Sequence, residues 1–114
     1  MNDLIIRDDA DNGVCTLTLN SETNRNALSK QMLETLLENI ETVSNDPEVR
    51  VVVIKANGPA FCAGHDLREI NVHREDPDQG ISFFESLMAL CAQTMLAIVN
   101  APKPVIAQVN GVAT

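Results

Sequence analysis

The chain contains no tryptophan and no tyrosine, and phenylalanine occurs only three times in 114 residues. Since 45% of the residues are nonetheless hydrophobic, the core must be built from aliphatic side chains, as is typical of α/β proteins. Basic residues are also few, eight against sixteen acidic ones, and the net charge is −8. This balance argues against a nucleic-acid backbone or an anionic membrane surface as the main partner.

Cysteine is scarce, and the three present, Cys15, Cys62 and Cys91, are far apart and form no CxxC pair. The sequence shows neither a disulfide framework nor a zinc-binding pattern, so a reducing compartment is expected. The first nine residues lack a cationic region and carry acids, which disfavours a transit peptide, and no uninterrupted apolar run is long enough to cross a bilayer. These features predict a soluble cytoplasmic protein without a membrane segment.

Four strands are predicted from the apolar residues. The first two, at residues 4–6 and 14–19, are separated by Asn12-Gly13, which is a strong hairpin signal. The second strand alternates, and its wholly apolar face, which should turn to the core, consists of Cys15, Leu17 and Leu19. Continuous apolar runs at 51–55 and 104–109 predict two further strands, both buried as in a parallel sheet.

Three helices are predicted between these strands. The first should begin after Ser29 as N-cap and run to about Asn45, because apolar residues recur at helical spacing until Asp46-Pro47. A short helix is expected at residues 67–73. A third helix at residues 81–99 is apolar on nearly every side, so it should be buried deeply, or buried partly against another subunit.

The start of the third helix carries a capping-box signature. Asp76 would be the N-cap, Pro77 would take the first helical position and Gln79 the third. The charged residues 74–80 would then form the connection between the second and third helices.

Residues 59–67 contain small side chains and a glycine directly after the apolar strand. Backbone N–H groups of such a turn can converge on a carbonyl and stabilise negative charge that develops on its oxygen. The alternative is a tight connection from strand to helix that needs Gly64 only for its geometry.

Residues 24–29 (NRNALS), 61–67 (FCAGHDL) and 104–111 (PVIAQVNG), with a Val/Ile strand between the first two, resemble the enoyl-CoA hydratase/isomerase (crotonase) family in order and separation. The likeness runs from about residue 5 to the last residue. It implies an α/β crotonase-like (ClpP/crotonase) fold, of which residues 1–114 would be the N-terminal half, one acyl-CoA-binding domain. Family members continue beyond the position of Thr114 into a glycine-rich turn and a second half with most of the catalytic carboxylates.

The resemblance also implies a site. Two backbone N–H groups of the family form an oxyanion hole around the thioester carbonyl; His65 would supply the first through its main chain, and the second would follow Thr114. Asp66 is interpreted as the cap of the short helix rather than as a catalytic acid. The path of the CoA moiety would be lined, largely by main-chain atoms, by Arg25, Ala27, Leu28, Ala63, Gly64, His65, Asp66 and Leu67.

The function implied by the resemblance is hydration or isomerisation of an enoyl-CoA by a homotrimer or hexamer, with CoA thioester as substrate and no further cofactor or metal. The chain alone would then be inactive. One alternative is a member that keeps acyl-CoA binding but has changed its acid/base pair. Another is a metal-binding or protein-interaction module, based on the apolar 81–99 helix and on Cys62, His65, Asp66 and His73. A further alternative is that the imidazole of His65 acts as a general base.

Overall fold

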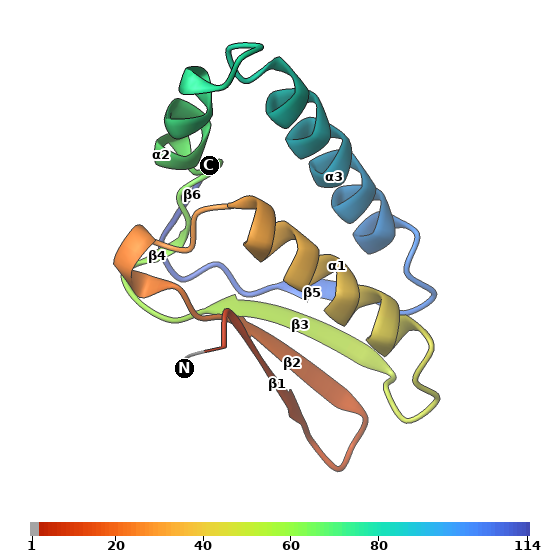
Figure 1. Ribbon diagram of the computed structural model, residues 1–114. Coiled ribbons are helices and arrows are strands. Elements are labelled where there is room, and N and C mark those ends of the chain that lie inside the picture. The colour runs from red at the N-terminus through yellow and green to blue at the C-terminus, as the bar shows by residue number, and fades with distance from the viewer. Residues whose placement is uncertain (1–2) are drawn as a thin grey trace.

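The computed structural model describes residues 3–114 and contains a four-stranded sheet with α1 (Lys30–Ser44) over one face (Figure 1). The strand order is β1 (Ile5–Asp9), β2 (Val14–Leu19), β3 (Val51–Ala56) and β5 (Val105–Ala107). The β1–β2 pair is antiparallel, whereas β3 runs parallel to both β2 and β5. The predicted α/β architecture is therefore present, with parallel strands joined by helices.

A second, two-stranded sheet is formed by β4 (Ala60–Cys62) and β6 (Val112–Ala113), which run parallel. Besides the two long helices, the described residues form three short helices. These are η1 (Glu22–Asn24), α2 (Leu67–Val72) and η2 (His73–Glu75). The short helix predicted after the loop is confirmed as α2, although its last turn tightens into the 3-10 helix η2.

The predicted face of β2 forms the centre of the core. Cys15, Leu17 and Leu19 are at most 3% exposed, and they lie beneath an apolar stripe of α1 that includes Met32 and Ile40. Burial of such large aliphatic side chains stabilises the fold by roughly 1.5–3 kcal/mol each. The hairpin between β1 and β2 turns at Asn12-Gly13 as predicted.

Helix α1 begins and ends as its sequence predicts. The Ser29 hydroxyl accepts a hydrogen bond from the Met32 N–H at 3.1 Å, which satisfies one of the donors left free in the first turn. At the other end the Lys103 ammonium donates to the carbonyl oxygens of Val43 and Asp46. A cation at the C-terminal carbonyls of a helix is favourable because it opposes the negative end of the helix dipole.

The predicted capping box of α3 (Ile81–Val99) is wrong. The Asp76 carboxylate instead pairs with Nδ1 of His73 at 2.7 Å, and the helix begins five residues later. Gly80 occupies the N-cap position with φ of 87°, which is a conformation that glycine adopts without strain. The carboxylate that accepts from the first N–H groups, those of Gly80 and Ser82, belongs to Asp78.

Deep burial of α3 is also wrong for the described chain. The helix lies against α1 (Figure 1), and only Leu87 and Thr94 among its residues are buried. Its large exposed apolar residues are Ile81, Phe84, Met95, Leu96 and Val99. By length and composition alone α3 could also cross a membrane, which corrects the expectation that no segment is long and apolar enough to do so. Partial burial against another subunit stays a prediction.

The strand predicted at residues 104–109 is shorter and more open than expected. β5 has three residues, lies at the edge of the sheet, and exposes 53% of Ile106. Within residues 3–114 no strand pairs with its outer edge, which is why the apolar run is not buried.

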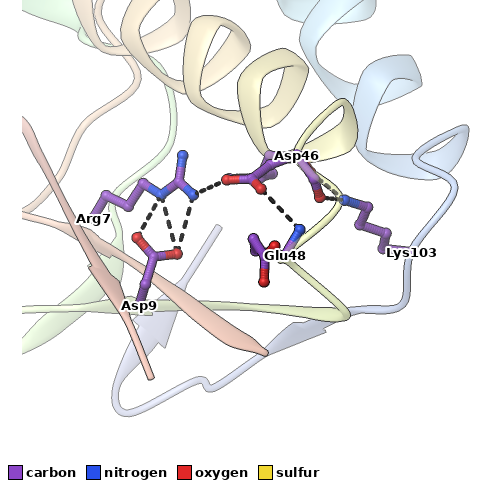
Figure 2. A network of polar contacts seen from close by, with 6 residues as sticks. Arg7, Asp9, Asp46, Glu48 and Lys103 are labelled. Atoms are coloured by element: carbon purple, nitrogen blue, oxygen red, sulfur yellow. Dashed lines mark hydrogen bonds and ion pairs between the residues drawn. The ribbon is translucent and has the colours of Figure 1, made fainter. Parts of the chain in front are cut away.

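An ion-pair network joins the hairpin to the end of α1 (Figure 2). The guanidinium of Arg7 lies 3.0 Å from Asp9 Oδ2 and 2.7 Å from Asp46 Oδ2. The hydrogen bonds that Arg7 donates lower the pKa of both carboxyl groups, and the same bonds raise the pKa of the guanidinium. The Asp46 carboxylate also accepts from the Glu48 N–H, so one side chain holds both the turn after α1 and the hairpin.

We expect Arg7→Met to lower the melting temperature at pH 7 but not in strong acid. Because the folded-state pKa values of Asp9 and Asp46 are lowered, their contribution is present above the ordinary carboxyl pKa of about 4. It is lost as the pH falls through the lowered values. Thermal unfolding of both proteins between pH 7 and pH 2 measures the difference; Arg50→Met, which removes an exposed guanidinium, is the control. A difference that does not become smaller as the pH falls would contradict the pairing.

Candidate functional site

The loop at residues 63–66 connects β4 to α2 and is shaped by a glycine and a helix cap. Gly64 has φ of 89°, in the region that favours glycine. The Asp66 carboxylate accepts from the N–H groups of Arg68 and Glu69 at 3.1 and 3.2 Å. The cap predicted at Asp66 is thereby confirmed, and this carboxylate is committed to holding α2 in place.

The two sequence motifs at residues 24–29 and 61–67 lie side by side. The Ala63 N–H donates to the Arg25 carbonyl at 3.1 Å, and the Leu28 N–H donates to the Gly64 carbonyl at 2.7 Å. Leu28 and His65 form a parallel bridge at the end of this contact. Residues almost forty positions apart therefore form one continuous wall of backbone.

A pocket of about 300 Å³ opens along this wall, with a surface that is part polar and part apolar. It is named the polar pocket for the charged residues Arg25, Asp66 and Arg68 in its lining. Six of the eight residues predicted to line the CoA path surround it, and the Arg25 and Arg68 side chains add two positive charges to a protein that is acidic overall. Those six residues are Arg25, Ala27, Ala63, His65, Asp66 and Leu67. The other two are placed differently, since Leu28 lines a second hollow and Gly64 shapes the loop.

This second hollow, of about 310 Å³, is apolar and was not foreseen from the sequence. It lies between α1, α3 and the ends of β3 and β5. The signal that could have found it is the apolar character of Leu28, Phe61 and Ile98; Leu28 was predicted to line the CoA path, whereas Phe61 and Ile98 were given no role in the site. Its lining consists of Leu19, Leu28, Leu36, Ile54, Phe61, Cys62, Met95, Ile98, Val105, Ala107, Ala113 and Thr114.

The loop therefore stands between the two hollows. Ala63 and His65 line the polar one, whereas Cys62 lines the apolar one. Among residues 3–114 the backbone N–H of His65 donates to no acceptor, although its neighbours Ala63 and Gly64 do. A free N–H at such a junction can donate to a ligand carbonyl.

Thr114 also lies at the loop. Its N–H donates to the Cys62 carbonyl at 3.0 Å, and its hydroxyl oxygen lies 2.9 Å from the place that a Cβ on Gly64 would occupy. The parallel pairing of β6 with β4 brings it there. Thr114 thus contacts the loop at Cys62 and Gly64.

The alternative of a metal-binding module has no support in the described part of the chain. No group of three metal-binding side chains comes together in residues 3–114. His73, one of the four candidates, pairs with Asp76 and stacks on Phe83 with ring centroids 3.7 Å apart. Cys62 accepts a hydrogen bond from the Gly64 N–H at 3.4 Å, which is an interaction within the loop.

Comparison with known proteins identifies this arrangement. A family model described as enoyl-CoA hydratase/isomerase matches residues 9–114. The chain belongs to the enoyl-CoA hydratase/isomerase family. The crotonase-like fold is confirmed as well, because an enoyl-CoA hydratase crystal structure from Mycobacterium smegmatis superposes with a TM-score of 0.86 at 46% identity, over 95% of this chain and 40% of that one.

Two curated relatives show the range of names within this family. "Enoyl-CoA hydratase domain-containing protein 3, mitochondrial" from Danio rerio is 47% identical over 90% of this chain and 34% of its own length. "1,2-epoxyphenylacetyl-CoA isomerase" from Escherichia coli is 38% identical over 89% of this chain and 38% of its own length. The chain thus spans little more than a third of these relatives.

The cytoplasmic location predicted from the sequence is wrong. The Danio rerio relative is named as mitochondrial, and so are similar proteins from rat and human. The prediction rested on the composition of the first residues and on the cysteines. These 114 residues span about a third of the Danio rerio relative, so their composition does not determine the location of the complete protein.

We expect Gly64→Ala to destabilise the loop for two separable reasons. The left-handed backbone costs roughly 1–2 kcal/mol for a residue with a Cβ, and the new Cβ would lie 2.9 Å from the Thr114 hydroxyl. Thermal unfolding of Gly64→Ala, Thr114→Ala and the double variant separates them. The double variant should recover the steric part and keep the backbone part. Full stability of Gly64→Ala would contradict this account of the loop.

Proposed function

We propose that this chain supplies the acyl-CoA-binding part of an enzyme that acts on the thioester of an enoyl-CoA. The observation that carries the proposal is the unpaired N–H of His65, at the junction of a polar and an apolar hollow. A CoA thioester has the same division, with an anionic, polar carrier on one side of the carbonyl and an acyl chain on the other. The carbonyl would then lie at the loop.

The two hollows suit the two parts of such a substrate. Arg25 and Arg68 at the polar pocket would hold the phosphates locally, which is required because the net charge of −8 repels an anion. The apolar hollow, between α1 and α3, would take the acyl chain and keep water away from the reacting atoms.

The chemical role of the loop is to stabilise negative charge on the thioester oxygen. A backbone N–H donates more strongly to an oxyanion than to a neutral carbonyl, so it lowers the energy of the enolate-like or tetrahedral state relative to the bound substrate. The loop is pre-organised for this by Gly64 and by the bond from Leu28, so little rearrangement is required when the charge forms. We expect no cofactor to take part, and the CoA ester is the substrate.

The complete reaction would use residues outside this chain. We expect a second N–H donor after Thr114 and carboxylates that move the protons, so the 114 residues alone should be inactive. Loss of one oxyanion donor alone costs about 10²–10³ in rate. Whether the reaction is hydration or isomerisation depends on those carboxylates. Retention of acyl-CoA binding without either reaction would indicate the altered member of the family.

A homotrimer, or a pair of trimers, is the proposed assembly of the complete protein. The exposed apolar residues of α3, among them Leu96 at 58% and Val99 at 77%, are consistent with partial burial against another subunit. Multi-angle light scattering at micromolar concentration should give three or six times the mass of the chain. A monomer would contradict the assembly and leave the site proposal standing.

We expect His65→Ala to keep most of the activity of the complete protein and His65→Pro to abolish it. Alanine retains the N–H, whereas proline removes the donor and fixes φ. Both lose the imidazole equally, so the comparison isolates the backbone. The rate with a short enoyl-CoA is measured for each variant.

The fold of both His65 variants is checked by circular dichroism. If alanine is as damaging as proline while the fold is intact, the imidazole takes part in the chemistry, and the assignment to the backbone is wrong. If neither substitution changes the rate, the loop is structural and the oxyanion role fails.

A further inference from the structure

Asn26 is a fully buried polar residue between Arg25 and Ala27, which line the polar pocket, and each polar atom of its amide group has a hydrogen-bond partner. Its Oδ1 accepts from the Ser21 N–H at 2.7 Å. Its Nδ2 donates to the carbonyl oxygens of Asn57 at 2.9 Å and Ala60 at 3.0 Å. A buried amide with both donors and its acceptor satisfied holds three chain segments in fixed positions. These segments are the one before η1, the end of β3 and the start of β4.

The backbone around Asn26 adopts a conformation that requires such support. Arg25 and Asn26 have φ of 55° and 56°, two consecutive left-handed residues, neither of which is glycine. Each costs free energy and persists only where surrounding contacts determine it, although asparagine tolerates this region better than most residues. The only side chain that bonds this pair of residues to the β3–β4 turn, within residues 3–114, is that of Asn26.

The segment at residues 25–28, which Asn26 holds, in turn fixes the loop at residues 63–66. The Arg25 carbonyl accepts from Ala63, and the Leu28 N–H donates to Gly64, so the wall at residues 25–28 sets the register of residues 63–65. A shift of residues 25–28 would therefore move the His65 N–H and the Arg25 side chain together. Both groups line the pocket proposed for the CoA ester.

We propose that Asn26 is a positioning residue: it touches no substrate, but it sets the place of the His65 N–H and of Arg25 and thereby the affinity of the pocket for CoA esters. This inference rests on the function proposed above. It assigns to the second asparagine of the NRNAL segment, Asn26, the role of fixing the position of the residues that line the pocket.

The test uses Asn26→Gly in the complete protein. Glycine keeps the left-handed backbone accessible and removes all three side-chain hydrogen bonds, so conformation and bonding are separated. Amide hydrogen exchange at Leu28 and Ala63 should become at least about tenfold faster, and binding of CoA, measured by calorimetry, should weaken about tenfold. If Asn26→Gly does not fold, Asn26→Asp, which keeps the acceptor for Ser21, is measured in its place.

Asn110→Ala is the matched control. The Asn110 amide also donates to two carbonyls of the same turn, those of Ala56 and Gly58, but it does not bond to residues 25–28. It should leave exchange at Leu28 and Ala63, and CoA binding, unchanged. Equal effects of the two variants would show that the turn, and not Asn26, sets the loop, and would overturn the inference.

The remaining outcomes separate this inference from the proposed function. The role of Asn26 is overturned if hydrogen exchange at Leu28 and Ala63 is unchanged in the Asn26 variant. It is also overturned if exchange becomes faster but CoA binding is unchanged. If the unmodified complete protein binds no CoA, the proposed function fails, and the hydrogen exchange result alone decides whether Asn26 holds the loop.

Discussion

Two backbone hydrogen bonds, from Ala63 to Arg25 and from Leu28 to Gly64, are the contact on which the site depends. They join a segment that precedes α1 to the loop that follows β4, and neither segment is regular enough to hold itself. Each such bond contributes only about 1 kcal/mol net, so the contact needs the surrounding elements to keep its ends in place. The sheet below and the cap of Asp66 on α2 provide that support.

This arrangement explains how an acidic chain can present a site for an anionic ligand. Several acidic side chains are already paired within the chain: Asp9 and Asp46 with Arg7, Asp76 with His73, and Asp66 and Asp78 with helix N–H groups. The hydrogen bonds from Arg7 lower the pKa of Asp9 and Asp46. Arg25 and Arg68 are the cations beside the pocket. Local placement of charge, rather than the net charge of the chain, therefore determines what the loop can bind.

Much of the fold follows from local sequence. The alternating face of β2 and the Ser29 cap were predicted because each depends on neighbours within a few residues. The start of α3 was predicted wrongly because the Asp76 carboxylate pairs with His73 and does not cap the helix. Sequence rules for helix caps do not include such a competing side chain. For the site, the resemblance to the family indicated the lining residues, but only the structure shows that Leu28 turns to the other hollow and that Asn26 holds the wall.

The failures at α3 and β5 have one physical origin. Periodicity indicates which side chains are apolar but not what covers them, and here Met95, Ile98 and Val105 line a hollow. Binding of the CoA carrier would depend on this chain, since the loop and the arginines belong to it. Under the function proposed above, Met95, Ile98 and Val105 would contact the acyl chain, because their burial in this fold is incomplete and they line the apolar hollow.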